Sequence, residues 1–115
     1  MTNRSKTLKR NKSRKGNGNR KQICIKITNG CFAGLEIPVE RKKTTIGSDI
    51  NCNICLDHNL VSGEHALITR SGDSCKIEDL NSKQGIFING KEVHNARLKN
   101  RDRISIGNFD LLFYC

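Results

Sequence analysis

The stretch from Leu60 to Gly90, LVSGEHALITRSGDSCKIEDLNSKQGIFING, contains the strongest structural signals in the chain. Apolar residues alternate with polar residues along it, and clusters of Ser, Gly, Asp and Asn interrupt the alternation. This pattern predicts short strands joined by tight loops. The loops carry hydroxyls, amides and one lysine, groups that suit a small surface site for an anion or a polar peptide on a rigid β scaffold.

Two turns inside this stretch predict hairpins. Ser71–Asp73 contains a glycine and separates the alternating segments Ala66–Arg70 and Ser74–Glu78. Asn89-Gly90 follows the apolar run Ile86–Ile88, and this dipeptide is the strongest short hairpin signal because both residues tolerate positive φ. The centre of the chain is therefore expected to be antiparallel β structure.

The flanking sequence continues the same pattern. Further strands are predicted from residue 23 to 27, 34 to 39, 44 to 46, 54 to 56, 103 to 106 and 109 to 114. Pro38 lies in the second of these and indicates a sheet edge or a strand end. Cys55 is expected to pack inward beside Ile54 and Leu56. Many short strands and no helical pattern predict an all-β sandwich.

The net charge of +10 is unevenly distributed over the 115 residues. Residues 1–21 hold nine basic side chains and no acidic one, whereas residues 22–115 hold 12 basic and 11 acidic side chains. The first segment has almost no apolar side chains to bury, so we expect a disordered basic tail followed by one domain over 22–115. The tail is a solubilising leader, a localisation signal, or a contact for nucleic acid or an anionic lipid surface. It has no aromatic residue, so base stacking has no support.

Six cysteines are present. No apolar run is long enough to span a bilayer, and the N-terminus has no apolar core of a secretory signal. These observations predict a cytoplasmic protein, or a nuclear one in a cell with a nucleus. In such a compartment, reduced and mostly buried thiols are expected rather than disulfides.

Several short motifs occur in a fixed order between residues 23 and 114. They are Gly34-Leu35, Ile46-Gly47, Ser62-x-x-His65-Ala66, Asp79-x-x-Ser82-x-x-Gly85, Phe87-Ile88-Asn89-Gly90, Leu98-x-x-x-Asp102-x-Ile104 and Ile106-Gly107. This order resembles the forkhead-associated (FHA) domain. The resemblance implies an FHA/SMAD-like two-sheet β sandwich whose loops at one end bind phosphothreonine peptides, without catalysis and without a cofactor. A protein or phosphoprotein partner is then expected.

The resemblance also implies a set of site residues. The predicted phosphopeptide or partner-binding residues are Ser48, Ser62, Gly63, Lys83 and Gln84. The predicted supporting residues are Gly47, His65, Gly85, Asn89 and Gly90, with the His65 ring joining two loops. Ser62 and Lys83 supply donors for phosphate, and Gln84 stands where the family usually has an asparagine that holds the peptide backbone.

Ser48 is the main departure from the family pattern. The family has an arginine directly after the glycine that matches Gly47, and a guanidinium is the best single phosphate donor. Basic residues of the turn 41–43 are candidate substitutes. Residues 47–56 resemble FHA-like domains of type III secretion inner-ring proteins, which pack against partners without reading phosphate. Phosphothreonine recognition, phosphate-independent assembly, and nucleic-acid or anionic-surface contact through residues 1–21 therefore remain open alternatives.

Catalytic and metal sites have weaker support. Ser62 with His65 as its base lacks an orienting acid and an oxyanion loop. Cys52 and Cys55, with His58 and His65, lack the second cysteine pair that a structural zinc site needs. No enzyme activity, metal or cofactor is expected.

Overall fold

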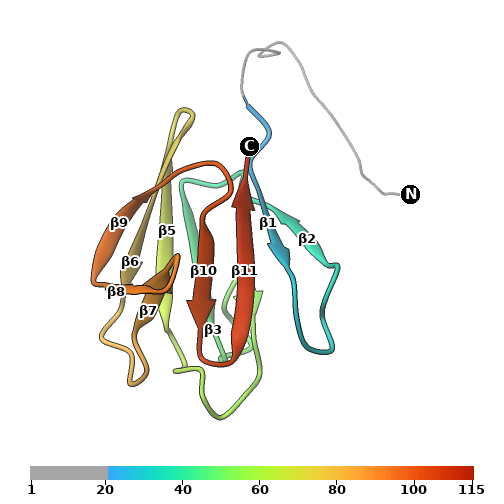
Figure 1. Cartoon of the computed structure of the whole chain (residues 1–115), viewed down its shortest axis with the longest axis vertical. Coiled ribbons are helices and arrows are strands. Elements are labelled where there is room, and N and C mark those ends of the chain that lie inside the picture. The colour runs from blue at the N-terminus through green and yellow to red at the C-terminus, as the bar shows by residue number, and fades with distance from the viewer. Residues whose placement is uncertain (1–20) are drawn as a thin grey trace.

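The computed structural model describes residues 21–115, which form eleven strands and no helix (Figure 1). The predicted disorder of the basic tail and the boundary after residue 21 concern residues outside this range, apart from Lys21. The all-β prediction is confirmed. No described segment has the helical length and apolar character needed to cross a membrane.

The strands form two sheets that pack face to face. The first sheet has the order β2 (Glu36–Pro38), β1 (Cys24–Ile27), β11 (Phe109–Tyr114), β10 (Arg103–Ile106), β7 (Ile86–Ile88) and β8 (Lys91–Val93). The second has the order β4 (Ile54–Cys55), β3 (Lys43–Gly47), β5 (Ala66–Ser71), β6 (Ser74–Asp79) and β9 (Asn95–Leu98). All pairs are antiparallel except β3 with β4. Pro38 lies in an edge strand, as predicted.

Both predicted hairpins are present. Ser71 pairs with Ser74 across the β5–β6 turn, and Ile88 pairs with Lys91 across the β7–β8 turn. Asn89 and Gly90 have φ values of 53° and 86°, the backbone that a type I′ turn requires.

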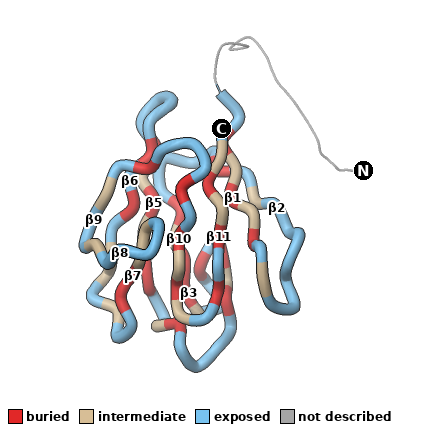
Figure 2. Tube along the Cα trace, viewed as in Figure 1, coloured by how far each residue is buried: buried red, intermediate tan, exposed pale blue. Residues whose placement is uncertain are grey.

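The core follows from the alternation along the strands. Ile68 in β5, Ile77 in β6 and Ile104 in β10 are fully buried between the sheets, and the residues beside them face outward. Figure 2 shows that buried positions follow the strands, whereas the connecting loops are exposed.

Two predictions about the cysteines are wrong. Cys55 does not pack inward: Ile54 and Leu56 are buried, and the alternation of a strand turns the residue between them outward. The thiols are also not mostly buried, because among the six free cysteines only Cys52 and Cys75 are.

The loops gather at two opposite ends of the sandwich. The β3–β4, β4–β5, β6–β7 and β10–β11 connections lie at the lower end in Figure 1. The start of the described chain, the β2–β3 and β9–β10 connections and the β5–β6 hairpin lie at the upper end. The lower end holds the predicted binding residues.

Candidate functional site

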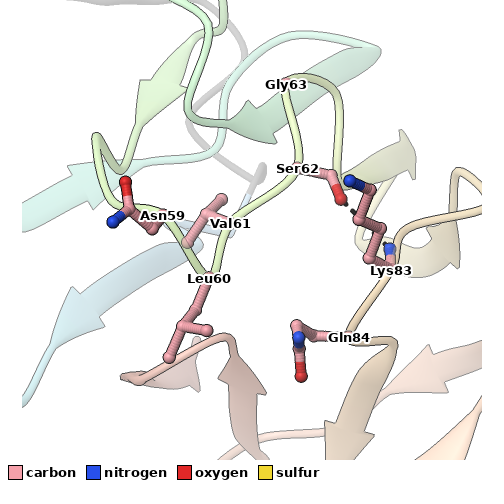
Figure 3. A pocket seen from close by; sticks show the side chains of 7 residues that line it. All are labelled: Asn59, Leu60, Val61, Ser62, Gly63, Lys83 and Gln84. Atoms are coloured by element: carbon pink, nitrogen blue, oxygen red, sulfur yellow. Dashed lines mark hydrogen bonds between the residues drawn. The ribbon is translucent and has the colours of Figure 1, made fainter.

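An open depression of about 280 Å³ lies at the lower end of the sandwich, between the β4–β5 and β6–β7 loops (Figure 3). Its lining residues are Asn59, Leu60, Val61, Ser62 and Gly63 from the first loop and Lys83 and Gln84 from the second. The two loops are separated by about twenty positions in the sequence, so the fold has to bring them together.

His65 joins the two loops. Its ring is fully buried at the start of β5. Nδ1 accepts a hydrogen bond from the backbone amide of Ser62 at 3.1 Å, and Nε2 lies 2.7 Å from the carbonyl oxygen of Gly85. These partners assign the neutral tautomer that carries its proton on Nε2, because a carbonyl only accepts. One imidazole therefore fixes the spacing of both walls of the depression.

A second bridge links Ser62 directly to the facing loop. The Ser62 Oγ accepts a hydrogen bond from the backbone amide of Lys83 at 3.1 Å. A hydroxyl also carries one proton to donate, so Ser62 keeps a donor for a ligand. In Figure 3 the Lys83 side chain runs back toward Ser62, whereas the Gln84 side chain points to the other side of the depression.

The β6–β7 loop is held by its own polar contacts. Asp79 accepts a hydrogen bond from the Ser82 hydroxyl, and the Ser82 Oγ accepts another from the Gly85 amide at 2.9 Å. Gly85 has a φ of +77°, a conformation that residues with a side chain rarely adopt. The spacing Asp79-x-x-Ser82-x-x-Gly85 therefore encodes a rigid loop that presents Lys83 and Gln84.

The β3–β4 loop packs tightly against the β4–β5 loop. Gly47 is required there, because a Cβ atom at this position would lie 2.0 Å from the carbonyl oxygen of Gly63. The next two amides bind the same segment: Ser48 N donates to the Ser62 carbonyl at 3.0 Å and Asp49 N to the Gly63 carbonyl at 3.1 Å. The β3–β4 loop therefore holds Ser62 and Gly63, which form one edge of the depression, in place.

Cys52 completes this support. Its buried Sγ lies 3.2 Å from the Gly63 carbonyl oxygen and donates to it. Burial raises the pKa of the Cys52 thiol, with Asp49 and Glu64 adding to the effect, so the group stays protonated and remains a donor.

The structure brings together four of the five predicted binding residues. Ser62, Gly63, Lys83 and Gln84 line the depression. Ser48 does not line it and lies beside Ser62 through its backbone. Asn59, Leu60 and Val61 of the same loop also line the depression and were not among the predicted binding residues. Their position directly before Ser62 could have indicated that they belong to the site. None of the three carries a charge or belongs to a motif of the family, so the residues themselves give no indication.

The basic turn 41–43 cannot replace the missing arginine. Lys43 begins β3 and Gly47 ends it. The rise along a strand places their Cα atoms about 13 Å apart, which exceeds the reach of a lysine side chain. Lys42 lies at the upper end of the sandwich, away from the depression, and its carbonyl accepts a hydrogen bond from Arg70 N at 2.8 Å.

Asn89 and Gly90 support the fold at a distance from the depression. The Asn89 side chain donates to the buried Asp102 carboxylate at 3.0 Å and accepts from the Arg103 amide at 3.0 Å. This pair of contacts ties the β7–β8 turn to the turn before β10. Neither residue lines the depression.

The geometry does not assemble a catalytic or metal-binding group from the residues first considered. Both ring nitrogens of His65 bond to backbone groups, so neither activates the Ser62 hydroxyl. The thiols of Cys52 and Cys55 donate to the carbonyls of Gly63 and Ser48. Within residues 21–115 no cluster of three or more His, Cys, Asp or Glu side chains is placed to hold a metal ion.

Comparison with known proteins agrees with this architecture. The oxoglutarate dehydrogenase inhibitor of Corynebacterium jeikeium is 32% identical over 87 residues, which is 76% of this chain and 60% of that protein. The glycogen accumulation regulator GarA of Mycolicibacterium smegmatis is 31% identical over 87 residues, 76% of this chain and 55% of that protein. The chain thus spans somewhat more than half the length of these curated relatives.

A solved structure of Mycobacterium tuberculosis EmbR, in complex with a low-affinity phosphopeptide, superposes with a TM-score of 0.75 at 26% identity. The match covers 81% of this chain and 24% of that one. The sequence model of the FHA domain matches residues 44–107, more than half of the chain. The chain therefore belongs to the FHA domain family.

Proposed function

We propose that the chain is a non-enzymatic protein-interaction module whose depression binds a phosphothreonine segment of a partner protein. The observation that carries this proposal is the 3.1 Å hydrogen bond between Lys83 N and Ser62 Oγ, which holds a hydroxyl donor and a lysine side chain at one open surface. The resemblance to the EmbR complex, which contains a phosphopeptide, supports the same assignment.

The chemistry of the depression matches the demands of a phosphothreonine. That group carries close to two negative charges and three acceptor oxygens at neutral pH. Ser62 offers a hydroxyl proton and Lys83 offers an ammonium group. The amides of Gly63 and Gln84 donate no hydrogen bond to any residue in 21–115, so they are available to ligand oxygens. The Gln84 side chain has both a donor and an acceptor for a peptide backbone.

Ser48 sets the expected strength of binding. Charge-assisted hydrogen bonds contribute about 1.5–3 kcal/mol each, so the missing arginine fork removes about 3 kcal/mol, or about a hundredfold in affinity. Among residues 21–115, Lys83 is the single cation that lines the depression. We therefore expect weak but phosphate-dependent binding.

The direct test is a titration of the full chain with a phosphothreonine peptide library and with the same library unphosphorylated. The proposal expects binding of phosphorylated members only, and a loss of about tenfold or more in affinity for Ser62→Ala and for Lys83→Gln. Equal affinity for both libraries, or binding of neither, would contradict it.

A second function, phosphate-independent assembly with a partner protein, is favoured by two observations. Ser48 stands at the arginine position, and the loops at the same end expose Ile50 (86%) and Leu60 (42%). Apolar side chains of this kind anchor protein interfaces. In this case phosphatase treatment of the partner leaves binding unchanged, and Leu60→Ser weakens binding more than Ser62→Ala.

A further inference from the structure

The end of the sandwich opposite the depression is strongly basic. It consists of Lys21, the segment 39–43, the hairpin tip 70–74 and the turn 99–102. These segments hold seven basic and three acidic side chains, a net charge of +4, whereas the other residues of 21–115 hold six basic and eight acidic side chains. We call this end the cationic pole. The eight basic residues of 1–20 precede it directly in the sequence.

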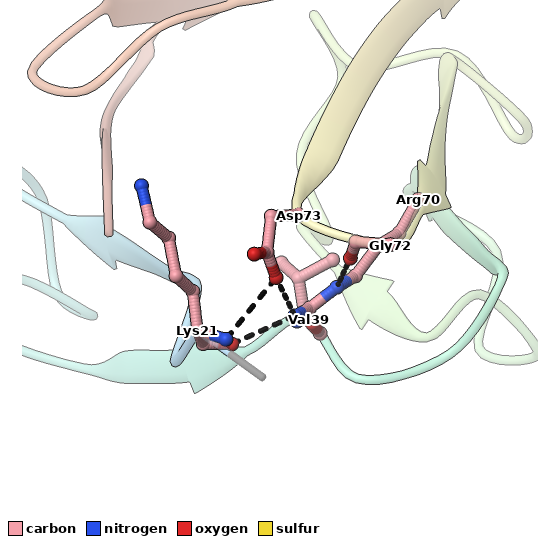
Figure 4. A network of polar contacts seen from close by, with 5 residues as sticks. All are labelled: Lys21, Val39, Arg70, Gly72 and Asp73. Carbon is pink, nitrogen blue, oxygen red and sulfur yellow. Dashed lines mark hydrogen bonds and ion pairs between the residues drawn. The ribbon is translucent and has the colours of Figure 1, made fainter. Parts of the chain in front are cut away.

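Arg70 fixes the arrangement of the pole. The side chain is 2% exposed and donates to three backbone carbonyls, those of Lys21, Val39 and Gly72 (Figure 4). It also lies 3.7 Å from the Asp73 carboxylate, which in turn accepts from the Lys21 amide at 3.1 Å. One buried guanidinium therefore joins the first described residue, the β2–β3 connection and the β5–β6 hairpin.

The remaining cations of the pole face solvent. The side chains of Arg41, Lys42, Lys43, Lys99 and Arg101 are exposed, and none forms an ion pair with another residue in 21–115. The β9–β10 turn joins this surface because Leu98 pairs with Cys75, next to the tip of the β5–β6 hairpin. Figure 4 shows the Lys21 ammonium directed away from Arg70 as well.

The pole lacks the apolar centre of a protein interface. Within residues 21–115, the four exposed large apolar side chains lie in loops of the opposite end (Figure 1); they are Phe32, Leu35, Ile50 and Leu60. Protein interfaces are enriched in aromatic and apolar residues at their centre, whereas contact with a nucleic-acid backbone requires cations alone. We propose that the cationic pole docks on the phosphate backbone of nucleic acid, without sequence preference and independently of the depression.

The test measures the fluorescence anisotropy of a short labelled duplex DNA of mixed sequence with the full chain, at roughly 50 to 200 mM salt. The test variant carries Arg41→Gln, Lys42→Gln, Lys43→Gln and Lys99→Gln, all exposed positions. Each lost phosphate contact lowers the slope of log affinity against log salt by about 0.9, so the slope should fall by about 3 to 4 and the affinity at low salt by tenfold or more.

The matched control is Lys83→Gln at the other end of the sandwich. It should leave DNA affinity unchanged and weaken phosphothreonine-peptide binding, whereas the pole variant should show the reverse. A wild-type salt slope in the pole variant would assign the binding to residues 1–20 and overturn the proposal. So would the absence of DNA binding by the full chain, or equal affinity for a polyglutamate chain of matched charge.

Discussion

At the scale of single residues, position 48 is expected to set how strongly the proposed site holds phosphate. The Ser48 amide donates to the Ser62 carbonyl at 3.0 Å, so the backbone at position 48 lies next to that of Ser62 at the edge of the depression. A serine at this point cannot reach as far as an arginine, and it carries no charge. The residue that most limits the proposed affinity therefore lies at the edge of the site rather than in it.

Ser48→Arg should raise the affinity for a phosphothreonine peptide by about ten- to a hundredfold, because it restores one bidentate charge-assisted contact. Isothermal titration measures the change. Ser48→Lys is the control, since it adds the same charge without the planar fork and should gain less. An unchanged affinity in Ser48→Arg, or an equal gain for the unphosphorylated peptide, would contradict the placement of phosphate beside Ser62.

Gly47 is predicted to be intolerant of any side chain. Gly47→Ala places a Cβ 2.0 Å from the Gly63 carbonyl oxygen, and we expect a loss of about 2 kcal/mol or more in the free energy of unfolding. Urea denaturation measures it. Gly63→Ala is the matched control from the other side of the contact: its Cβ meets nothing within 4 Å, so stability should hardly change. Equal losses in the two variants would argue against this close approach.

At the scale of elements, Arg70 of β5 joins Lys21, the β2–β3 connection and the β5–β6 hairpin, which the hydrogen bonds between strands do not connect. Arg70→Met removes the charge and leaves three carbonyls without their donor, for an expected loss of about 3 kcal/mol in unfolding free energy. Thermal and urea unfolding measure this loss. Lys76→Met, at an exposed position of the neighbouring strand, should change stability by less than about 0.5 kcal/mol. Similar effects at both positions would show that the Arg70 network adds no stability.

The elements themselves were largely predictable from sequence, because each hairpin is encoded locally. Asn89-Gly90 and Ser71–Asp73 specify their turns through the backbone freedom of a few residues, and period-two alternation marks the strands between them. Cys55 shows the limit of this reasoning. In a two-residue strand, its apolar neighbours on both sides suggested burial, and only the pairing of Ile54 with Ile46 fixes which face turns inward.

The site was predictable in part for a similar reason. Ser62, Lys83 and Gln84 lie within short sequence motifs, so their place in the site could be predicted. Leu60 and Val61 line the depression because the fold places their loop opposite Lys83. This contact joins residues far apart in the sequence, so no local sequence pattern indicates it. The burial of Arg70 could not be predicted from sequence either, because it depends on three carbonyls from segments far apart in the chain.

At the scale of the whole molecule, a ligand that binds the lower loops is expected to stabilise the folded chain. A phosphothreonine peptide at ten times its Kd should add about 1.4 kcal/mol to the unfolding free energy. For a domain of this size that raises Tm by roughly 5–10 °C, which differential scanning fluorimetry detects. The unphosphorylated peptide should leave Tm unchanged. The phosphopeptide at the same concentration should raise the Tm of Ser62→Ala by no more than about 3 °C, because a tenfold loss of affinity leaves about 0.4 kcal/mol. A full-size shift in Ser62→Ala would place the ligand elsewhere.

The central claim is that one end of the sandwich, through the walls set by His65, reads phosphothreonine. Amide chemical-shift mapping by NMR tests it most directly, using the full chain with a phosphothreonine peptide and then its unphosphorylated form. The account predicts that the largest shifts fall on Ser62, Gly63, Lys83 and Gln84, in the phosphorylated titration only. Shifts confined to the cationic pole, or identical shifts with both peptides, would contradict it.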